Sequence, residues 1–143
     1  MTGMTGYEMF WPIIAHATLV YILYALLGYR RKKMVKAGKV RVSDYRENRS
    51  EPPESLFVKN SIANQYELPM LFYACCVLLY MTEADNLIAV VLAWIFVALR
   101  YAHAYVHVTS NRIRYRSPLF AAGYVVLGVM WVWLAVWMMF PNG

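Results

Sequence analysis

The stretch NSIANQYELP, residues 60–69, places polar side chains inside a segment that is otherwise apolar enough to cross a membrane. Asn60, Asn64 and Glu67 recur at i, i+4 and i+7, so on a helix they form one polar stripe. A carboxylate inside a spanning helix costs about 2.5 to 3.5 kcal/mol on insertion scales, and it therefore faces a partner or a wet cavity. The stretch predicts a functional site. The alternative interpretation is a single buried polar contact between helices.

Pro69 divides the same segment. A proline within a helix leaves the carbonyl four residues earlier, here that of Gln65, without its amide partner. We therefore expect a bend in this helix directly beside the polar stripe.

The composition predicts a small membrane protein built only of helices. Of the 143 residues, 61% are hydrophobic and 16% aromatic, and the mean hydropathy is +0.41, well above that of a soluble domain. Four apolar stretches are each roughly 20 residues or longer, the length at which a helix crosses ~30 Å of hydrocarbon. These predicted spans are residues 10–29, 56–81, 86–108 and 118–140. We expect one domain over residues 1–143, an all-α four-transmembrane-helix bundle.

The positive charges are confined to two loop regions and the third span. Ten of the 14 Lys and Arg residues lie between Arg30 and Lys59, and the other four are residues 100, 112, 114 and 116. The positive-inside rule predicts a multi-pass protein with both basic loops in the cytoplasm and both termini on the other side, in a bacterial inner membrane or the endoplasmic reticulum. Gly38 and Asn142 then lie on opposite sides. The basic loops predict contact with anionic membrane lipids and no binding of nucleic acid.

The first connection is the longest. Residues 30–33 are all basic and are expected to close the first helix. Residues 34–55 are polar, and we expect them to form an exposed loop that is partly ordered over the cytoplasmic opening.

Arg100, in the third predicted span, lies at the same depth as Glu67. Each is about ten residues, or roughly 15 Å along the helix axis, from the cytoplasmic end of its helix. An arginine and a glutamate at one level on neighbouring helices offset each other's cost of burial. We therefore expect an ion pair between them.

Two histidines follow Arg100 on the same helix face. His103 and His107 have the i, i+4 spacing of two-histidine metal sites, but no third ligand motif accompanies them. Cys75 and Cys76 are adjacent and face different sides of their helix, which predicts neither a disulfide nor a metal site. We expect no metal.

The fourth predicted span begins with Ser117-Pro118, the pattern of an N-cap followed by proline at the first helical position. Arg116 would then lie just outside the helix N-terminus and its free amides, with Arg112 and Arg114 nearby. Such a cluster suits an anion or a forming thiolate. The alternative is that these arginines only enforce the membrane topology.

These features together resemble the membrane-associated proteins in eicosanoid and glutathione metabolism, the MAPEG family, in particular members like microsomal glutathione transferase and prostaglandin E synthase. The resemblance rests on four short spans, on the Asn64-x-x-Glu67 pair and on residues 100–118, and it covers nearly the whole chain. It implies a homotrimer that binds glutathione between neighbouring subunits, toward the cytoplasmic side.

The resemblance also implies roles for single residues. Asn64 and Glu67 would bind glutathione, and Arg100 would support Glu67. The residues spaced as in leukotriene C4 synthase are Arg100, Tyr101, Tyr105 and Arg112. The residues spaced as in microsomal prostaglandin E synthase are Arg100, His103, Arg112, Arg116 and Ser117. The arginine that activates the thiol is open between Arg112 and Arg116, and we favour Arg116 because it directly precedes Ser117 and the expected helix start.

The chain departs from the family pattern at two positions. Asn60 stands where eukaryotic members usually have an arginine, and Pro69 comes one residue early. We therefore expect Lys59 or Arg31 to bind part of the glutathione carboxylates.

The expected function is that of a glutathione transferase, with peroxidase activity as a further reaction, which activates the thiol for attack on lipophilic electrophiles or lipid hydroperoxides. The expected partners are further copies of the chain, glutathione as co-substrate, lipophilic small molecules and membrane lipids. Two alternatives stay open. One is a non-catalytic lipid- or glutathione-binding scaffold, like the five-lipoxygenase-activating member of the family, and the other is a small proton-coupled transporter that uses Glu67 and the histidines.

Overall fold

The computed structural model describes residues 6–46 and 51–140, and every regular element in this part of the chain is a helix. In chain order the helices are α1 (Phe10–Lys36), α2 (Val42–Arg46), α3 (Pro53–Gln65), α4 (Leu68–Met81), α5 (Leu87–Val108) and α6 (Ile113–Met139). With α3 and α4 taken as one interrupted segment, four segments are long and apolar enough to cross a membrane. The predicted all-α, four-span membrane fold is confirmed. Asn142 and residues 47–50 of the predicted loop lie outside the described residues.

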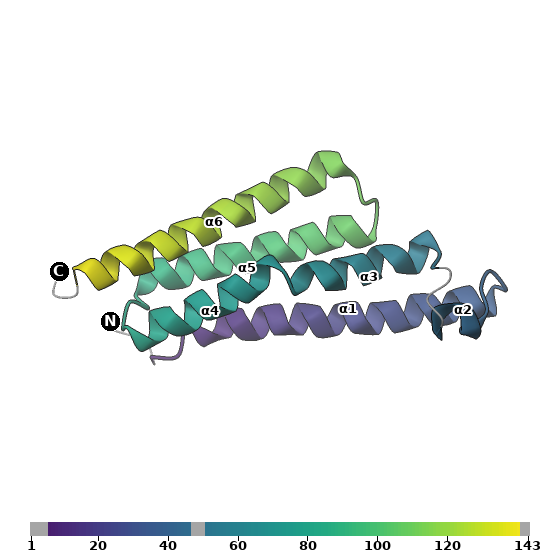
Figure 1. Cartoon of the computed structure of the whole chain (residues 1–143), viewed down its shortest axis with the longest axis horizontal. Helices are drawn as coiled ribbons and strands as arrows, with labels where there is room; N and C mark the ends of the chain where they lie inside the picture. The colour runs from purple at the N-terminus through teal and green to yellow at the C-terminus, as the bar shows by residue number, and fades with distance from the viewer. Residues whose placement is uncertain (1–5, 47–50, 141–143) are drawn as a thin grey trace.

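The four segments pack side by side as an antiparallel bundle (Figure 1). The start of α1, the α4–α5 connection and the end of α6 lie at one end, and α2 and the α5–α6 turn lie at the other, which we call the basic end. Phe72 and Phe96 centre the apolar cluster nearer the termini, with ring centroids stacked 4.5 Å apart. Toward the basic end, a second cluster joins α1, α3 and α5 through Leu23, Val58 and Ala104.

The second span is interrupted beside the polar stripe. α3 ends at Gln65, Tyr66 and Glu67 connect the two helices, and α4 begins at Leu68. Pro69 is therefore in the first turn of α4, where an amide has no intrahelical partner and its loss costs little. The expected bend is present as a complete break. As a result Glu67 does not continue the stripe of α3, because it lies exposed at the N-cap position of α4.

α1 extends well past its predicted end. Lysine and arginine are good helix formers and are favourable near a helix C-terminus, so the basic run lengthens the helix instead of closing it. The helix ends in a Schellman motif at Gly38, whose φ is +74°. The amide of Gly38 donates to the Val35 carbonyl at 3.0 Å and that of Lys39 to the Met34 carbonyl at 3.1 Å. The predicted loop over residues 34–55 is thus wrong in part, since it contains the end of α1, all of α2 and the start of α3.

α6 begins at Ile113, so the predicted helix start at Ser117 is wrong. The N-cap residue is Arg112, and Pro118 is the sixth residue of the helix, with Ile113 as the first. Pro118 has no amide for the carbonyl of Arg114, but Arg114 is exposed, where solvent can bond that carbonyl instead. The helix therefore runs through the proline without a break.

Candidate functional site

A hollow of about 470 Å³ opens between α3, α5 and α6 at the basic end of the bundle. We call it the α3–α5–α6 pocket. Its lining residues are Asn60, Asn64, His103, His107, Ile113, Arg116, Ser117 and Phe120. The fold thus brings five of the predicted site residues into one pocket. The other three lining residues are His107 and two apolar residues, Ile113 and Phe120.

Asn64 is held in place from behind by Arg100. The guanidinium of Arg100 donates through Nη2 to the Asn64 side-chain oxygen and, at 3.3 Å, to Oε1 of Gln65. The Asn64 amide nitrogen in turn donates to Oε1 of Glu67 at 3.3 Å. The predicted ion pair between Glu67 and Arg100 is therefore wrong, because the helix break moves Glu67 outward and the Asn64 carboxamide lies between the two charges.

Arg100 keeps unused donors inside the bundle. Arg100 is only 1% exposed, and its Nε and Nη1 atoms are enclosed with no hydrogen-bond partner among the described residues. A buried guanidinium without a full set of acceptors is costly, so such a group in a native structure calls for a functional or structural reason. The positive charge of Arg100, directly behind the lining residue Asn64, therefore favours an anionic ligand in the pocket.

His103 and His107 form a pair on the α5 face of the pocket. Their ring centroids are 5.8 Å apart and both residues are almost fully buried. Neither Nδ1 atom has a hydrogen-bond partner in the described part of the chain. Among residues 6–46 and 51–140, no group of three His, Cys, Asp or Glu side chains is close enough to hold a metal ion. The pair therefore offers hydrogen bonds to a ligand and only two nitrogen ligands to a metal.

Arg116 lies on the α6 wall, in the second turn of that helix. Its Nη1 donates to the side-chain oxygen of Asn111 at 2.7 Å. Its backbone amide donates to the Arg112 carbonyl at 2.9 Å, so this amide is not free for an anion. The expected cooperation of Arg116 and Ser117 with free helix amides is therefore wrong. Both residues nevertheless line the wall of the same pocket.

Six predicted site residues do not line this pocket: Arg100 and Glu67, described above, and Tyr101, Tyr105, Arg112 and Arg31. Tyr101 points to α1, where its hydroxyl donates to the Ala15 carbonyl at 2.7 Å. Tyr105 is 70% exposed on the outer face of α5, and Arg112 is exposed at the start of α6. Arg31 is engaged elsewhere, in an ion pair at the basic end.

That ion pair links the end of α1 to the start of α3. Arg31 donates to both carboxylate oxygens of Glu51, at 2.7 and 3.2 Å, and its guanidinium lies 4.8 Å from the ring centre of Tyr45 in α2. Ser55 donates a further hydrogen bond to Glu51. Burial alone would raise the pKa of the Glu51 carboxyl, but the hydrogen bonds from Arg31 and Ser55 and the charge of Arg31 hold that pKa below its usual value.

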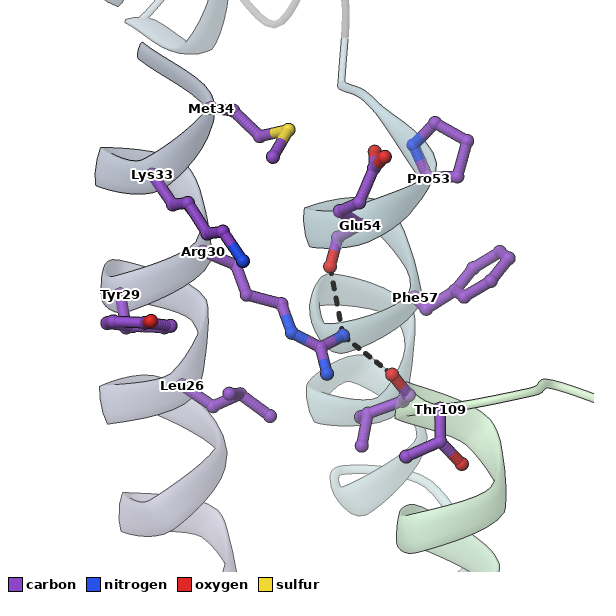
Figure 2. A pocket seen from close by; sticks show the side chains of 10 residues that line it. Leu26, Tyr29, Arg30, Lys33, Met34, Pro53, Glu54, Phe57 and Thr109 are labelled. Carbon is purple, nitrogen blue, oxygen red and sulfur yellow. Dashed lines mark hydrogen bonds between the residues drawn. The ribbon is translucent and has the colours of Figure 1, made fainter. Parts of the chain in front are cut away.

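A second and larger hollow, of about 590 Å³, lies between α1, α3 and the end of α5. Figure 2 shows the Arg30 side chain crossing it from α1, with its guanidinium between the two other helices. Nη1 of Arg30 donates to the carbonyls of Glu54, at 3.0 Å, and Val108, at 2.6 Å. Arg30 thereby caps a free carbonyl at the end of α5 and ties three helices together.

Sequence reasoning predicted a hydrogen-bonded histidine at position 16 but did not connect the polar groups behind the pocket with one another. Gln65, the last residue of α3, is fully buried and contacts Arg100 and His16. His16 also contacts the hydroxyl of Tyr73 in α4. A signal was present, because a buried glutamine and a histidine within apolar spans each need a partner.

Comparison with known proteins gives one family. The model of the MAPEG family matches residues 9–136, which is most of the chain. Neither the curated proteins nor the solved structures contain a match.

Proposed function

Because this chain belongs to the MAPEG family, which includes glutathione transferases and related enzymes, we propose that it is a glutathione-dependent membrane enzyme. It would activate the glutathione thiol for attack on lipophilic electrophiles or for reduction of lipid hydroperoxides. The observation that carries this proposal is the α3–α5–α6 pocket, where polar and basic side chains from three helices face one hollow at the basic end of the bundle.

The binding part of the proposal depends on Asn64. Arg100 and Glu67 occupy opposite ends of its carboxamide, so its orientation toward the pocket is fixed before a ligand arrives. Glutathione carries two carboxylates and two peptide groups, which suit the amides of Asn60 and Asn64 and the rings of the two histidines that line the pocket. A preorganised amide costs little ordering entropy on binding.

The chemical part of the proposal depends on Arg116. A thiol with a pKa near 8.5 is only a few per cent ionised at neutral pH, and each unit of lowering is worth about 1.4 kcal/mol. The Arg116 guanidinium on the pocket wall, with the Ser117 hydroxyl beside it, supplies the positive charge and the hydrogen bonds that favour a thiolate. The electrophile would then accept the sulfur electron pair next to the apolar side chains of Ile113 and Phe120.

The proposal extends to a homotrimer. Tyr105 and Arg112 are exposed and do not line the pocket of their own chain, so they are free to complete the site of a neighbouring subunit. Lipophilic substrates would enter laterally from the bilayer and glutathione from the aqueous basic end. This arrangement separates the two routes.

The test is a binding and conjugation assay on purified, detergent-solubilised protein. Isothermal titration should give saturable glutathione binding, and an activated aryl halide should yield its glutathione conjugate with turnover above the uncatalysed rate. Binding without conjugation or peroxidase activity would favour the non-catalytic scaffold instead. Absence of binding at millimolar glutathione in several detergents and in lipid nanodiscs would refute the proposal.

A further inference from the structure

A continuous chain of hydrogen bonds runs through the bundle to the pocket. It begins at the Tyr73 hydroxyl, 2.6 Å from Nδ1 of His16, and continues from Nε2 of His16 to Oε1 of Gln65 at 2.9 Å. The same oxygen of Gln65 accepts from Arg100 at 3.3 Å, and Arg100 donates to Asn64. One residue each from α1, α4 and α5 and two from α3 take part, so the chain spans the break between α3 and α4.

The direction of each bond follows from the groups involved. The Gln65 amide nitrogen donates to the Ser61 carbonyl at 3.1 Å, which turns the amide oxygen toward His16 and Arg100. Because that oxygen can only accept, the neutral His16 ring carries its proton on Nε2 and accepts from Tyr73 at Nδ1. Every bond in the chain then has one donor and one acceptor.

His16 is the second of the five residues in this chain of hydrogen bonds, and it does not line the pocket. Its side chain is fully buried, as is that of Gln65. Gln65 is the last residue of α3, and residues at a helix end move more easily than those in its middle. The hydrogen bond from His16 therefore fixes the Gln65 side chain at the point where the α3 backbone loses its regular hydrogen bonds.

We propose that His16 is a positioning residue for the glutathione site: by holding Gln65 at the end of α3, it keeps Arg100, and through Arg100 the Asn64 amide, in the conformation that faces the pocket. This inference rests on the proposed function. Arg100 makes its only side-chain hydrogen bonds within the described residues to Asn64 and Gln65, so displacement of Gln65 leaves Asn64 to orient the guanidinium alone. Loss of the His16 bond should therefore make the Asn64 amide, which binds glutathione, less firmly oriented and leave Arg116 unchanged.

The experiment compares His16→Leu with His16→Gln. Leucine keeps the bulk and removes both ring nitrogens, whereas glutamine can donate its amide hydrogen to Gln65 from nearly the same place. We expect His16→Leu to raise the Kd and KM for glutathione about tenfold, the equivalent of one net hydrogen bond of about 1.4 kcal/mol, and to change kcat by less than about threefold. His16→Gln should recover most of the affinity.

The matched control is Trp133→Phe, which removes another hydrogen bond between segments, from the indole nitrogen to the Ala84 carbonyl at 3.2 Å, outside this chain. It should lower the Tm without changing glutathione affinity. If His16→Leu also lowers only the Tm, and the Kd stays within about twofold of wild type, His16 is a packing residue and the inference is overturned while the proposed function stands.

Two further outcomes are decisive. If His16→Leu does not fold, Tyr73→Phe replaces it, because it removes a single hydroxyl and should weaken glutathione binding about threefold, as expected for part of one hydrogen bond. Unchanged affinity in Tyr73→Phe would then overturn the inference. If the wild-type protein binds no glutathione, the proposed function fails and the inference fails with it.

Discussion

Arg116 and Asn111 are joined by a hydrogen bond of 2.7 Å, from Nη1 of the guanidinium to the side-chain oxygen, across the turn between α5 and α6. Asn111 has a φ of +51°, in the left-handed region that asparagine tolerates better than most residues. A guanidinium has five N–H donors, and this bond uses one of them. The turn therefore orients Arg116 while most of its donors stay available to a ligand in the pocket.

The Asn111 bond can be tested with two substitutions. Asn111→Gly and Asn111→Ala both release Arg116, and we expect both to lower kcat by roughly three- to tenfold, the range for one hydrogen bond to a charged group. Only alanine is strained at this φ, by about 1 kcal/mol, so the Tm should fall in Asn111→Ala and stay near wild type in Asn111→Gly. Steady-state kinetics and thermal unfolding measure the two effects separately. Equal kcat in wild type and Asn111→Gly would show that Arg116 needs no orientation.

Glutathione should stabilise the folded protein against heat. A ligand that binds only the folded state adds about 2.7 kcal/mol at a concentration of 100 times its Kd. Asn64→Ala should remove most of this shift, and Glu67→Gln should reduce it less because Glu67 acts through Asn64. Thr18→Ala, an exposed change on α1, serves as the control. An undiminished shift in Asn64→Ala would remove Asn64 from the binding site.

Acid should weaken the link between α1 and α3. Hydrogen bonds and charge hold the folded-state pKa of Glu51 below the ordinary value of 4.5, so its contribution to stability is full above that value and is lost as the pH falls through the lower folded-state pKa. At neutral pH, Glu51→Gln should therefore lower the free energy of unfolding by about 1 kcal/mol or less. The difference from wild type should shrink as the pH falls below 4.5 and through the folded-state pKa. A difference that is independent of pH would show that the pair contributes through packing alone.

The topology predicted from the charges can be tested by labelling. Ala37 follows α1 at the basic end and Glu83 lies in the α4–α5 connection at the opposite end, and both are exposed. Ala37→Cys and Glu83→Cys should react with a membrane-impermeant maleimide from opposite sides of sealed vesicles, with Ala37 on the cytoplasmic side. Cys75 and Cys76 are fully buried, so wild type is the unlabelled control. Labelling of both variants from one side would contradict four spans.

The sequence predicted the features that depend on composition and local chemistry. Spanning helices follow from apolar length, and the break follows from Pro69, because both are properties of the segment itself. Ser117-Pro118 was a false helix start, because α6 begins earlier, at Ile113. A proline near an exposed helix end costs little stability, since solvent can bond the carbonyl that it leaves free. A local pattern cannot distinguish these two cases.

Contacts between helices were harder to predict. Matching depth correctly placed Arg100 near the polar stripe, but which side chain accepts its hydrogen bonds depends on helix rotation and on the break, which moves Glu67 out and leaves Asn64 and Gln65 in reach. His16 lies 49 positions before Gln65 in the sequence, and no local pattern connects them. Such pairs follow only from the packed structure.

The last prediction concerns the arginine that activates the thiol. Arg116 lines the pocket, whereas Arg112 is exposed at the N-cap of α6 and does not line it. Arg116→Ala should therefore lower kcat about 10- to 100-fold, the loss of a charged hydrogen bond of about 1.5 to 3 kcal/mol, and change the KM for glutathione by only a few-fold. Arg112→Ala should mainly raise that KM, because in a trimer it would lie at the edge of a neighbouring site and contact a carboxylate.

Charge and hydrogen bonding at position 116 can be separated by Arg116→Lys, which keeps the charge but not the planar fork of donors. Recovery of kcat by lysine would show that positive charge alone lowers the thiol pKa. This can be measured directly as the thiolate absorbance of bound glutathione against pH, and the apparent thiol pKa should rise in Arg116→Ala and stay near wild type in Arg112→Ala. The roles are reversed if instead Arg112→Ala raises the thiol pKa and abolishes turnover, while Arg116→Ala leaves the thiol pKa and the turnover as in wild type. The activating charge must then come from a neighbouring subunit, since Arg112 does not reach the pocket of its own chain.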